Sequence, residues 1–486
     1  MVSARNEYLM SIEYSPVTPR IVAELRRIVG DRYVIHGDAE KLTAFSHDAI
    51  ADPHYAHMPE VAVRPAGAEE IAAIMKLANR ERIPVTPRGA GSGLSGGAVP
   101  LYGGIVLLND RMNRILEIDR ENLMVVVEPG VITNEINERL KEFGLFYPGY
   151  PMSLEMCYIG GNVAENAGGG KAVKYGVTAR YVMGIEMVTP KGEIVEFGGK
   201  RVKDVTGYNM LQLMVGSEGT LGIFTRITLK LLPLPKSAVS LLCLFPSAAE
   251  AISAVPRIMT GSGIIPTAIE FMDRQCVQIS CDYLNESIPR EGAGAMLLMT
   301  VDGAGEDQVE REYDLVGEMA LRGGAFQVYV ADNATTAERI WRVRRGIPEA
   351  LNLITPNQSS EDIVVPMARI PKLIEAFEVL GARYGVRVPC YGHAGDGNMH
   401  SHVLADPSWS SEHWAAICPR ILTDLYKLTA SLGGTLSGEH GIGHKRKRYM
   451  PLVVSEPALE MMRAVKLALD PNLVLNPGKI FDFDSP

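Results

Sequence analysis

The stretch PRGAGSGLSGGAVP, residues 87–100, decides the fold class of this chain of 486 residues. Seven glycines fall within residues 89–104, whereas the whole sequence contains 48. Because glycine has no side chain, a run of glycines leaves the backbone N–H groups unobstructed and can form a nest for phosphate oxygens. The loop is therefore predicted to hold a phosphate-bearing ligand.

The same loop satisfies a GxGxxG pattern at Gly91, Gly93 and Gly96, which is also the signature of Rossmann dinucleotide-binding folds. A Rossmann loop opens directly into a helix, whereas here Pro100 and two further glycines precede the strand-like run IVLL. The pattern therefore favours a pyrophosphate loop that has no long helix behind it.

Two further glycine-rich clusters lie at residues 159–176 (IGGNVAENAGGGKAVKYG) and 215–225 (VGSEGTLGIFT). One such loop is commonly structural, but three in one region predict a large phosphate-bearing ligand that is wrapped by backbone. Hydrophobic periodicity predicts helices over residues 18–30, 67–82 and 131–144, with short strand-like runs between them.

Five of the ten histidines fall in two C-terminal stretches, YGHAGDGNMHSH (391–402) and SGEHGIGHK (437–445). The AGDGN turn between two strand-like runs predicts a hairpin that brings His393 and His400 face to face. Glu439 lies in a glycine-rich loop. Two imidazoles and a carboxylate with a fourth position left open suit a catalytic divalent metal.

Other residues of these stretches have simpler interpretations. His402 lies two positions beyond His400 on the same strand face, and we interpret it as a hydrogen-bonding core residue. His444 begins the charge run HKRKR, which we interpret as a solvated surface.

Composition narrows the function classes. The length predicts about three domain-sized units, and the net charge of −9 argues against a nucleic-acid partner. The six cysteines are scattered without a CxxC pair, so the sequence predicts neither a disulfide framework nor an iron–sulfur cluster. Neither a secretory signal nor a transmembrane segment is recognisable, so we expect a cytoplasmic protein, with peripheral attachment to the inner membrane face also compatible.

In combination, these motifs resemble flavoproteins with a vanillyl-alcohol-oxidase-type FAD domain, specifically the D-2-hydroxyacid dehydrogenase branch. The resemblance covers about residues 45–482. It rests on the 87–100 loop, the segment Pro148–Tyr175, VKDVTGYNMLQLMVGSEGTLGIFTRITLKLLP, GHAGDGNMH, SGEHGIG and LDPNLVLNPGKIF.

The resemblance implies an α+β fold, with a two-subdomain FAD-binding domain of the p-cresol methylhydroxylase type and an α+β cap domain with an antiparallel sheet. Together with the change in composition after LKLLPLPKS, it predicts four segments. These are an N-terminal helical segment that starts the FAD domain (1–57), the rest of the FAD domain (58–236), a cap or substrate domain (237–415) and a segment returning to the FAD domain (416–486).

FAD would be bound non-covalently, because members with covalent flavin use a histidine of the pyrophosphate loop and residues 87–100 contain none. The residues implied in cofactor binding are Arg88, Gly89, Gly91, Ser92, Gly93, Leu94, Ser95, Gly96, Gly97, Pro148, Gly160, Gly161, Asn162, Gly168, Gly170, Tyr175, Gly222, Ile223 and Asn476.

The resemblance also implies a metal site and a proton acceptor. His393, His400 and Glu439 match the ligands of a divalent ion, which would be zinc, iron or manganese. His440, the next residue, matches the residue that accepts a proton from the substrate.

Substrate binding is implied at three positions. Asn398 matches a substrate-contacting residue, and Arg344 matches an arginine that grips the substrate carboxylate, with Arg345 an alternative for that role. Ser360 stands where D-2-hydroxyglutarate dehydrogenases carry a lysine for a distal carboxylate, which favours D-lactate or glycolate.

These expectations describe an enzyme that oxidises a small D-2-hydroxy acid to the 2-oxo acid, by hydride transfer to flavin and metal-assisted proton abstraction. Electrons would pass to an external acceptor, namely an electron-transfer flavoprotein, a quinone, a cytochrome or an iron–sulfur partner subunit, and a homodimer or a hetero-complex is left open. Three alternatives also stay open: D-2-hydroxyglutarate dehydrogenase-like activity, a zinc hydrolase, and a non-catalytic electron-transfer flavin subunit.

Overall fold

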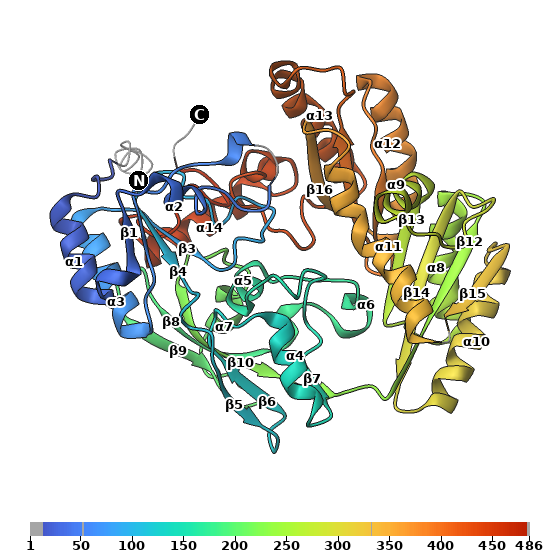
Figure 1. Cartoon of the computed structure of the whole chain (residues 1–486), viewed down its shortest axis with the longest axis horizontal. Coiled ribbons are helices and arrows are strands. Elements are labelled where there is room, and N and C mark those ends of the chain that lie inside the picture. Colours follow the sequence, from blue (N-terminus) through green and yellow to red (C-terminus); the bar gives the residue numbers. More distant parts are fainter. Residues whose placement is uncertain (1–12, 51–52, 332, 484–486) are drawn as a thin grey trace. The chain divides into compact units, whose positions relative to one another are not determined.

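A computed structural model describes residues 13–50, 53–331 and 333–483 (Figure 1). The start of the chain, where the sequence shows no secretory signal, lies outside these residues. The contacts between Cα atoms divide the chain into two compact units. The first takes in the chain up to Ala167, residues 177–233 and the chain from Glu439 onward, and the second takes in residues 168–176 and 234–438.

The first unit contains a small sheet that ends at the glycine loop. Helix α1 (Pro19–Val29) starts at its cap Thr18 and stops at Gly30, as the sequence predicts. Its apolar stripe and that of α3 (Ala68–Glu81) pack on the sheet in one core. The strands of this sheet are β1 (Val34–His36), β2 (Val61–Val63), β4 (Ile105–Leu108) and β3 (Val85–Arg88). They lie in the order β1-β2-β4-β3, and the last three are parallel.

A second, antiparallel sheet completes this unit in the order β5-β6-β10-β8-β9. Its strands are β5 (Ile115–Asp119), β6 (Met124–Val127), β10 (Ile223–Lys230), β8 (Val182–Val188) and β9 (Ile194–Gly198). This unit also contains the helices α2 (Ala39–Thr43), α4 (Thr133–Lys141), α5 (Ile159–Glu165), α7 (Met210–Met214) and α14 (Glu456–Leu469), and the strand pair β7 (Leu145–Phe146) and β11 (Leu232–Pro233). The two sheets correspond to the two expected subdomains.

The second unit is built on an antiparallel sheet in the order β15-β12-β14-β13-β17-β18-β16 (Figure 1). Its strands are β12 (Ser237–Phe245), β13 (Ala268–Asp273), β14 (Ala295–Gly303), β15 (Gln327–Ala331), β16 (Gln358–Val364), β17 (Cys390–His393) and β18 (Asn398–Leu404). An antiparallel sheet with helices is what the sequence predicts for a cap domain.

Helices cover both faces of this sheet. Leu242 and Leu244 of β12 share an apolar cluster with helices α9 (Arg274–Leu284) and α11 (Ala334–Asn352). Because side chains alternate along a strand, the neighbouring buried residues point to the other face, where α8 and α10 contact the same sheet. The bounds of the other helices are α6 (Ala172–Tyr175), α8 (Ala248–Ser262), α10 (Glu306–Arg322), α12 (Ile370–Tyr384) and α13 (Ser411–Ser431).

The compact units differ from the expected segments at three places. The sequence ended the cap domain at residue 415, inside α13, but this helix runs unbroken from its cap Ser410 and contacts α12 and β16, so the second unit continues to Gly438. Residues 168–176, which we had assigned to the FAD domain, also cluster with the second unit, because they pack on its sheet. The boundary between the units after β11 lies at Pro233 rather than at residue 236.

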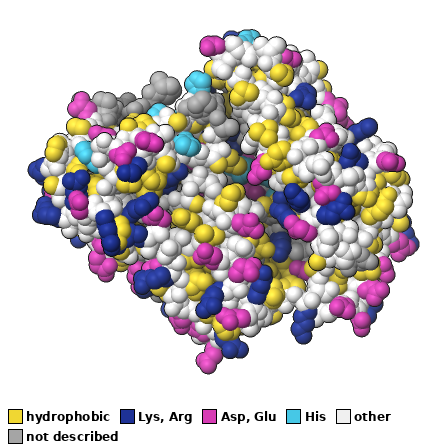
Figure 2. All heavy atoms as spheres, in the orientation of Figure 1, with side chains coloured by type: hydrophobic (Ala, Val, Ile, Leu, Met, Phe, Trp, Pro, Cys, Tyr) yellow, Lys and Arg dark blue, Asp and Glu magenta, His cyan; other side chains and the backbone are white. Residues whose placement is uncertain are grey.

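No helix in the described parts of the chain has both the length and the apolar character needed to cross a bilayer. On the face drawn in Figure 2, acidic and basic side chains are interspersed rather than gathered into a basic patch.

Candidate functional site

The glycine-rich segments of the first unit meet where β3 ends. A Cβ atom built on Gly89 would lie 4.0 Å from the nitrogen of Gly161, which belongs to the second glycine cluster. A Cβ atom on Gly219, in the third cluster, would lie 2.9 Å from Pro87. Three clusters that are separate in sequence therefore adjoin one another.

The glycine loop presents a row of backbone donors. Among the described residues, no oxygen accepts a hydrogen bond from a backbone N–H of residues 89–95. The next two amides are used, since Gly96 donates to Asp48 Oδ2 at 2.7 Å and Gly97 donates to Ser95 Oγ at 3.2 Å. Successive donors that lack protein partners suit phosphate oxygens, so the loop fits the pyrophosphate of FAD.

Two residues implied in cofactor binding, Arg88 and Asn162, form hydrogen bonds through their side chains to neighbouring segments of the first unit. Arg88 is buried and donates to the carbonyl oxygens of His47, at 2.7 Å, and Ala44, at 3.3 Å. Asn162 is also buried, and its Nδ2 donates to Thr133 Oγ1 at 2.7 Å. Both side chains therefore hold backbone segments in place.

The remaining implied residues of the first unit lie in tight backbone contacts. The N–H of Gly160 donates to the Pro129 oxygen at 2.8 Å, and a Cβ atom on Gly222 would lie only 2.1 Å from Met187 Cε. Ile223 follows as the first residue of β10, and Pro148 is buried after β7.

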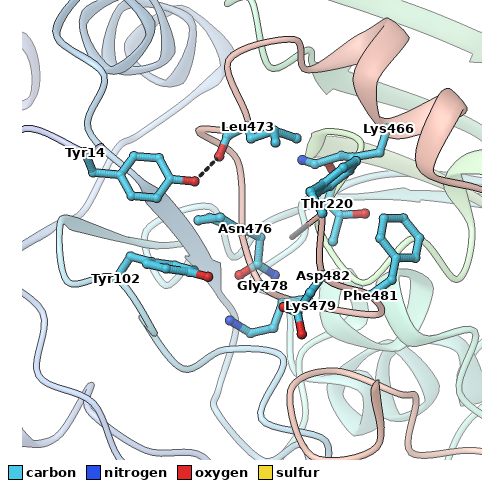
Figure 3. A pocket seen from close by; sticks show the side chains of 12 residues that line it. Tyr14, Tyr102, Thr220, Lys466, Leu473, Asn476, Gly478, Lys479, Phe481 and Asp482 are labelled. Carbon is cyan, nitrogen blue, oxygen red and sulfur yellow. Dashed lines mark hydrogen bonds between the residues drawn. The ribbon is translucent and has the colours of Figure 1, made fainter. Parts of the chain in front are cut away.

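Asn476, the last residue implied in cofactor binding, joins two of the loops. Its Nδ2 donates to the oxygens of Gly97, at 3.0 Å, and Glu218, at 2.8 Å. Its Oδ1 is buried and accepts no hydrogen bond from the described residues. Asn476 lines a pocket of about 250 Å³, shown in Figure 3, into which Tyr102 and Lys479 also project. Burial lowers the pKa of Lys479 to about 7.

The basic run at residues 444–448 is not the solvated surface that we expected. Arg446 is fully buried, and only 5% of Lys445 is exposed. The physical reason is a set of acidic residues from distant segments: Asp48 and Glu218 are buried, and Glu165 is half-buried with a buried Oε2 atom. Burial, followed by the charge of Glu218, raises the pKa of Glu165 well above its usual range. Lys445 lies near Asp48, and Arg446 lies near Glu165 and Glu218; their positive charges partly offset the rise in pKa that burial causes in these acids.

In the second unit, β17 and β18 form the expected hairpin around residues 394–397. The register pairs His393 with Asn398 and Tyr391 with His400. The two histidines are therefore diagonal neighbours on one face of the sheet, not directly opposite as the turn alone suggested. Their Nε2 atoms are 3.4 Å apart, and their rings lie nearly perpendicular, at 88°.

Each histidine has a buried carboxylate on its Nδ1 side. Glu270 Oε1 lies 2.7 Å from His393 Nδ1, and Asp362 Oδ1 lies 3.6 Å from His400 Nδ1. Carboxylates in this position orient metal-binding imidazoles. The convergence of two Nε2 atoms backed by acids fits a divalent ion.

Arg344 belongs to the same cluster through Glu270. Only 2% of Arg344 is exposed, and its Nε and Nη2 lie 2.8 and 2.6 Å from Glu270 Oε2. Burial alone would raise the pKa of Glu270, but the charges and hydrogen bonds of His393 and Arg344 more than offset it, so the pKa lies below its usual value. Arg345 is exposed and pairs with Glu338, so the geometry favours Arg344 for a role in the site.

Asn398 lies beside Asp362 at the end of the hairpin. Its Nδ2 donates to Asp362 Oδ1 at 2.7 Å, whereas its Oδ1 is buried and accepts no hydrogen bond from the described residues. Asp362 Oδ2 also accepts from the N–H of Gly438 at 2.9 Å. Gly438 is the last residue of the second unit, and Glu439 and His440 are the next two residues of the chain.

Three residues implied in cofactor binding, Gly168, Gly170 and Tyr175, lie in the second unit. A Cβ atom on Gly170 would lie 2.6 Å from Glu270 Oε1 and 3.7 Å from His393 Cε1. The Tyr175 hydroxyl donates to Asp302 Oδ2 at 2.9 Å. The glycine-rich segment that begins with α5 in the first unit thus continues, along the chain, to the histidine cluster.

His402 is a hydrogen-bonded core residue, as the sequence indicates. Its Nδ1 lies 3.1 Å from Gln358 Oε1, and its Nε2 lies 3.3 Å from both the Ser360 and Tyr391 hydroxyls.

Comparison with known proteins supports this assembly of motifs. The family model of FAD linked oxidases, C-terminal domain, matches residues 234–480, and that of the FAD binding domain matches residues 59–198. The glycolate oxidase subunit GlcD of Bacillus subtilis (strain 168) is 37% identical over 469 residues, which cover 96% of this chain and 98% of that protein. The chain belongs to the FAD-linked oxidase family.

A second relative is similar to the same extent, and a solved structure shares the fold. A D-lactate dehydrogenase of Anaerostipes hadrus is 38% identical over 473 residues, covering 96% of this chain and 98% of that protein. The solved structure of p-cresol methylhydroxylase with substrate bound superposes with a TM-score of 0.78 at 18% identity, covering 98% of this chain and 100% of that one. That likeness confirms the predicted fold class.

Sequence reasoning missed two carboxylates of the histidine cluster in this FAD-linked oxidase. Glu270 and Asp362 are both fully buried. A signal for Glu270 was present in the strand AIEFM, because an ionisable residue inside an apolar strand is rarely buried without a partner.

Proposed function

We propose that this FAD-linked oxidase dehydrogenates a small D-2-hydroxy acid, D-lactate or glycolate, to the 2-oxo acid. The observation that carries the proposal is the convergence of the His393 and His400 Nε2 atoms beside Arg344 and Asn398 in one buried cluster. Relatives named glycolate oxidase subunit and D-lactate dehydrogenase support the substrate class. Family membership argues against the zinc-hydrolase alternative.

The free amides of residues 89–95 would hold the pyrophosphate of non-covalently bound FAD. When bound, the flavin supplies a hydride acceptor for the hydrogen on C2 of the substrate. The loops give the cofactor backbone donors, and the buried cations Lys445 and Arg446 offset the acids beneath the loop.

We assign a divalent ion, zinc, iron or manganese, to His393, His400 and Glu439. Such an ion would lower the pKa of the substrate hydroxyl as a Lewis acid. His440, next to a ligand in the chain, would accept the hydroxyl proton on a ring nitrogen. The substrate thus loses its O–H proton to the protein and its C2 hydrogen as hydride.

Arg344 and Asn398 would orient the substrate. Arg344 would bind the carboxylate through N–H groups that Glu270 leaves available, and the buried Oδ1 of Asn398 would accept a hydrogen bond from the substrate. Ser360 is hydrogen-bonded to His402 and supplies no cation for a second carboxylate, which favours a monocarboxylate. We expect a cytoplasmic enzyme that passes its electrons to an external acceptor, a flavoprotein, quinone, cytochrome or partner subunit.

Anaerobic titration tests the proposal directly. D-lactate or glycolate should bleach the flavin absorbance, whereas L-lactate should leave it unchanged and D-2-hydroxyglutarate should act weakly. Chelation and dialysis should abolish bleaching without releasing FAD, and Zn²⁺, Fe²⁺ or Mn²⁺ should restore it. If none of these acids bleaches the flavin, the proposed substrate class is refuted. Full activity of metal-free protein would refute the metal site.

A further inference from the structure

Glu270 is one of two fully buried carboxylates of the histidine cluster, beside Asp362. It lies on β13, directly opposite His393 of β17, and its exposed fraction is 0%. One carboxylate oxygen meets His393 Nδ1 at 2.7 Å, and the other meets the guanidinium of Arg344 at 2.6–2.8 Å. A single carboxylate therefore contacts both an assigned metal ligand and the assigned substrate arginine.

The contact with Glu270 determines which ring nitrogen of His393 carries the proton. An ionised carboxylate can only accept hydrogen bonds, so Nδ1 of His393 must be protonated. When the imidazole is neutral, as a metal ligand must be, Nε2 then carries no proton and has a lone pair; this is the atom that lies 3.4 Å from His400 Nε2. This is the tautomer that a metal ligand on Nε2 requires.

The surroundings leave Glu270 no freedom to turn away. A Cβ atom on Gly170 would lie 2.6 Å from Glu270 Oε1, so the backbone of residues 168–176 closes that side of the carboxylate. Arg344 closes the other side and is itself stacked over the Tyr391 ring, 4.8 Å from its centroid.

We propose that Glu270 is a positioning residue, which fixes the tautomer of His393 and holds Arg344 so that the imidazole presents an unprotonated Nε2 to a divalent ion. This inference rests on the proposed function for the identity of the ion. Glu270 itself would touch neither the ion nor the substrate.

The variant Glu270→Gln separates the two contacts of the carboxylate. Arg344 can only donate, so the amide oxygen of the new side chain must face Arg344 and its NH₂ group must face His393. The imidazole must then accept at Nδ1 and carry its proton on Nε2. The lone pair needed for the metal disappears, although size and packing are nearly unchanged.

Two measurements on the full-length, FAD-loaded protein test this prediction. The first measures zinc bound at equilibrium after dialysis of chelator-treated protein against buffered Zn²⁺. We expect Glu270→Gln to bind zinc about 10- to 100-fold more weakly, which is typical for loss of a residue that orients a ligand. The second reads the tautomer of His393 by ¹⁵N NMR in metal-free protein, and we expect Nδ1–H in the wild type and Nε2–H in the variant.

Glu361→Gln is the matched control. Glu361 is an equally buried carboxylate in the same sheet, but its hydroxyl partners, Ser359 and Tyr426, lie on the other face of β16 from Asp362. The Glu361→Gln substitution should leave zinc affinity and the His393 tautomer unchanged. His393→Ala removes the assigned metal ligand itself and shows how far zinc affinity falls without it.

Normal zinc affinity in Glu270→Gln, together with lost affinity in His393→Ala, would overturn the role of Glu270 while the metal site stands. Failure of the wild type to bind zinc would instead exclude zinc as the ion of the proposed function, and the tautomer measurement would then decide the role of Glu270 alone. A wild-type His393 protonated on Nε2 overturns the inference even if the variant does not fold.

Discussion

The glycine loop of the first unit and the histidine hairpin of the second unit offer binding groups of opposite kinds. The loop offers main-chain donors, the N–H groups of residues 89–95, which any residue type can supply if no side chain obstructs them. In the proposed metal site, the hairpin would offer side-chain acceptors, the Nε2 atoms of His393 and His400, and each imidazole has a buried carboxylate on its Nδ1 side. A site made of backbone should therefore be sensitive to added bulk, and a site made of side chains should be sensitive to lost groups.

The strongest test of this contrast removes one side-chain group. His440→Ala should keep its FAD, because the loops that hold the cofactor are unchanged, but should lose about 10²–10⁴ of its turnover, the usual contribution of a positioned base. Stopped-flow reduction of the flavin by D-lactate measures the loss. The exposed His413→Ala serves as the control and should reduce normally. Near-normal turnover would remove His440 from the role of proton acceptor.

A smaller effect is expected when bulk is added to the backbone site. Gly443 has a φ of +52°, and a Cβ atom there would lie 2.2 Å from the backbone oxygen of Ser95 in the glycine loop. Gly443→Ala should lose about 2–3 kcal/mol of stability from this clash and release FAD at lower urea concentration. Gly37→Ala, which has a φ of +75° but open space around it, should lose only about 1 kcal/mol. Equal losses would show that dihedral strain, not the close approach, sets the cost.

The smallest effect concerns the pH dependence of the buried basic run. Burial, followed by the charges of Lys447 and Lys479, lowers the pKa of His444 from 6.5 to about 4. Below pH 6.5 the unfolded chain binds this proton more readily than the folded one, so stability should fall as the pH drops from about 6.5 to 4. His444→Gln should weaken this decline, as measured by urea midpoints at pH 7.5 and 5. Parallel curves for the two proteins would contradict the depressed pKa.

The same contrast explains which features could be predicted from sequence. The density of glycines between residues 89 and 104 predicts the phosphate-binding loop, because its N–H groups all come from consecutive residues and no distant segment is needed to form it. The turn sequence at residues 394–397 likewise predicts the hairpin of β17 and β18. These local patterns also place α1, α3 and the strands around the loop.

Features made by distant residues were missed. Glu270 precedes its partner His393 by 123 positions, and no local pattern links them. The basic run at 444–448 was misinterpreted because its counter-charges, Asp48, Glu165 and Glu218, come from three other segments. The end of the second unit differed from the expected boundary because the sequence of a helix such as α13 does not show which sheet the helix packs on.

The route of the chain between the two units limits how the protein can be divided. A gene split after Pro233 would not yield two self-sufficient fragments. The downstream fragment would lack residues 168–176, whose backbone packs against Glu270. The upstream fragment would lack Asn476, which is hydrogen-bonded to two of the glycine-rich loops. Engineering that exchanges the second unit between related enzymes must therefore transfer residues 168–176 together with residues 234–438 and keep the chain from Glu439 onward with the first unit.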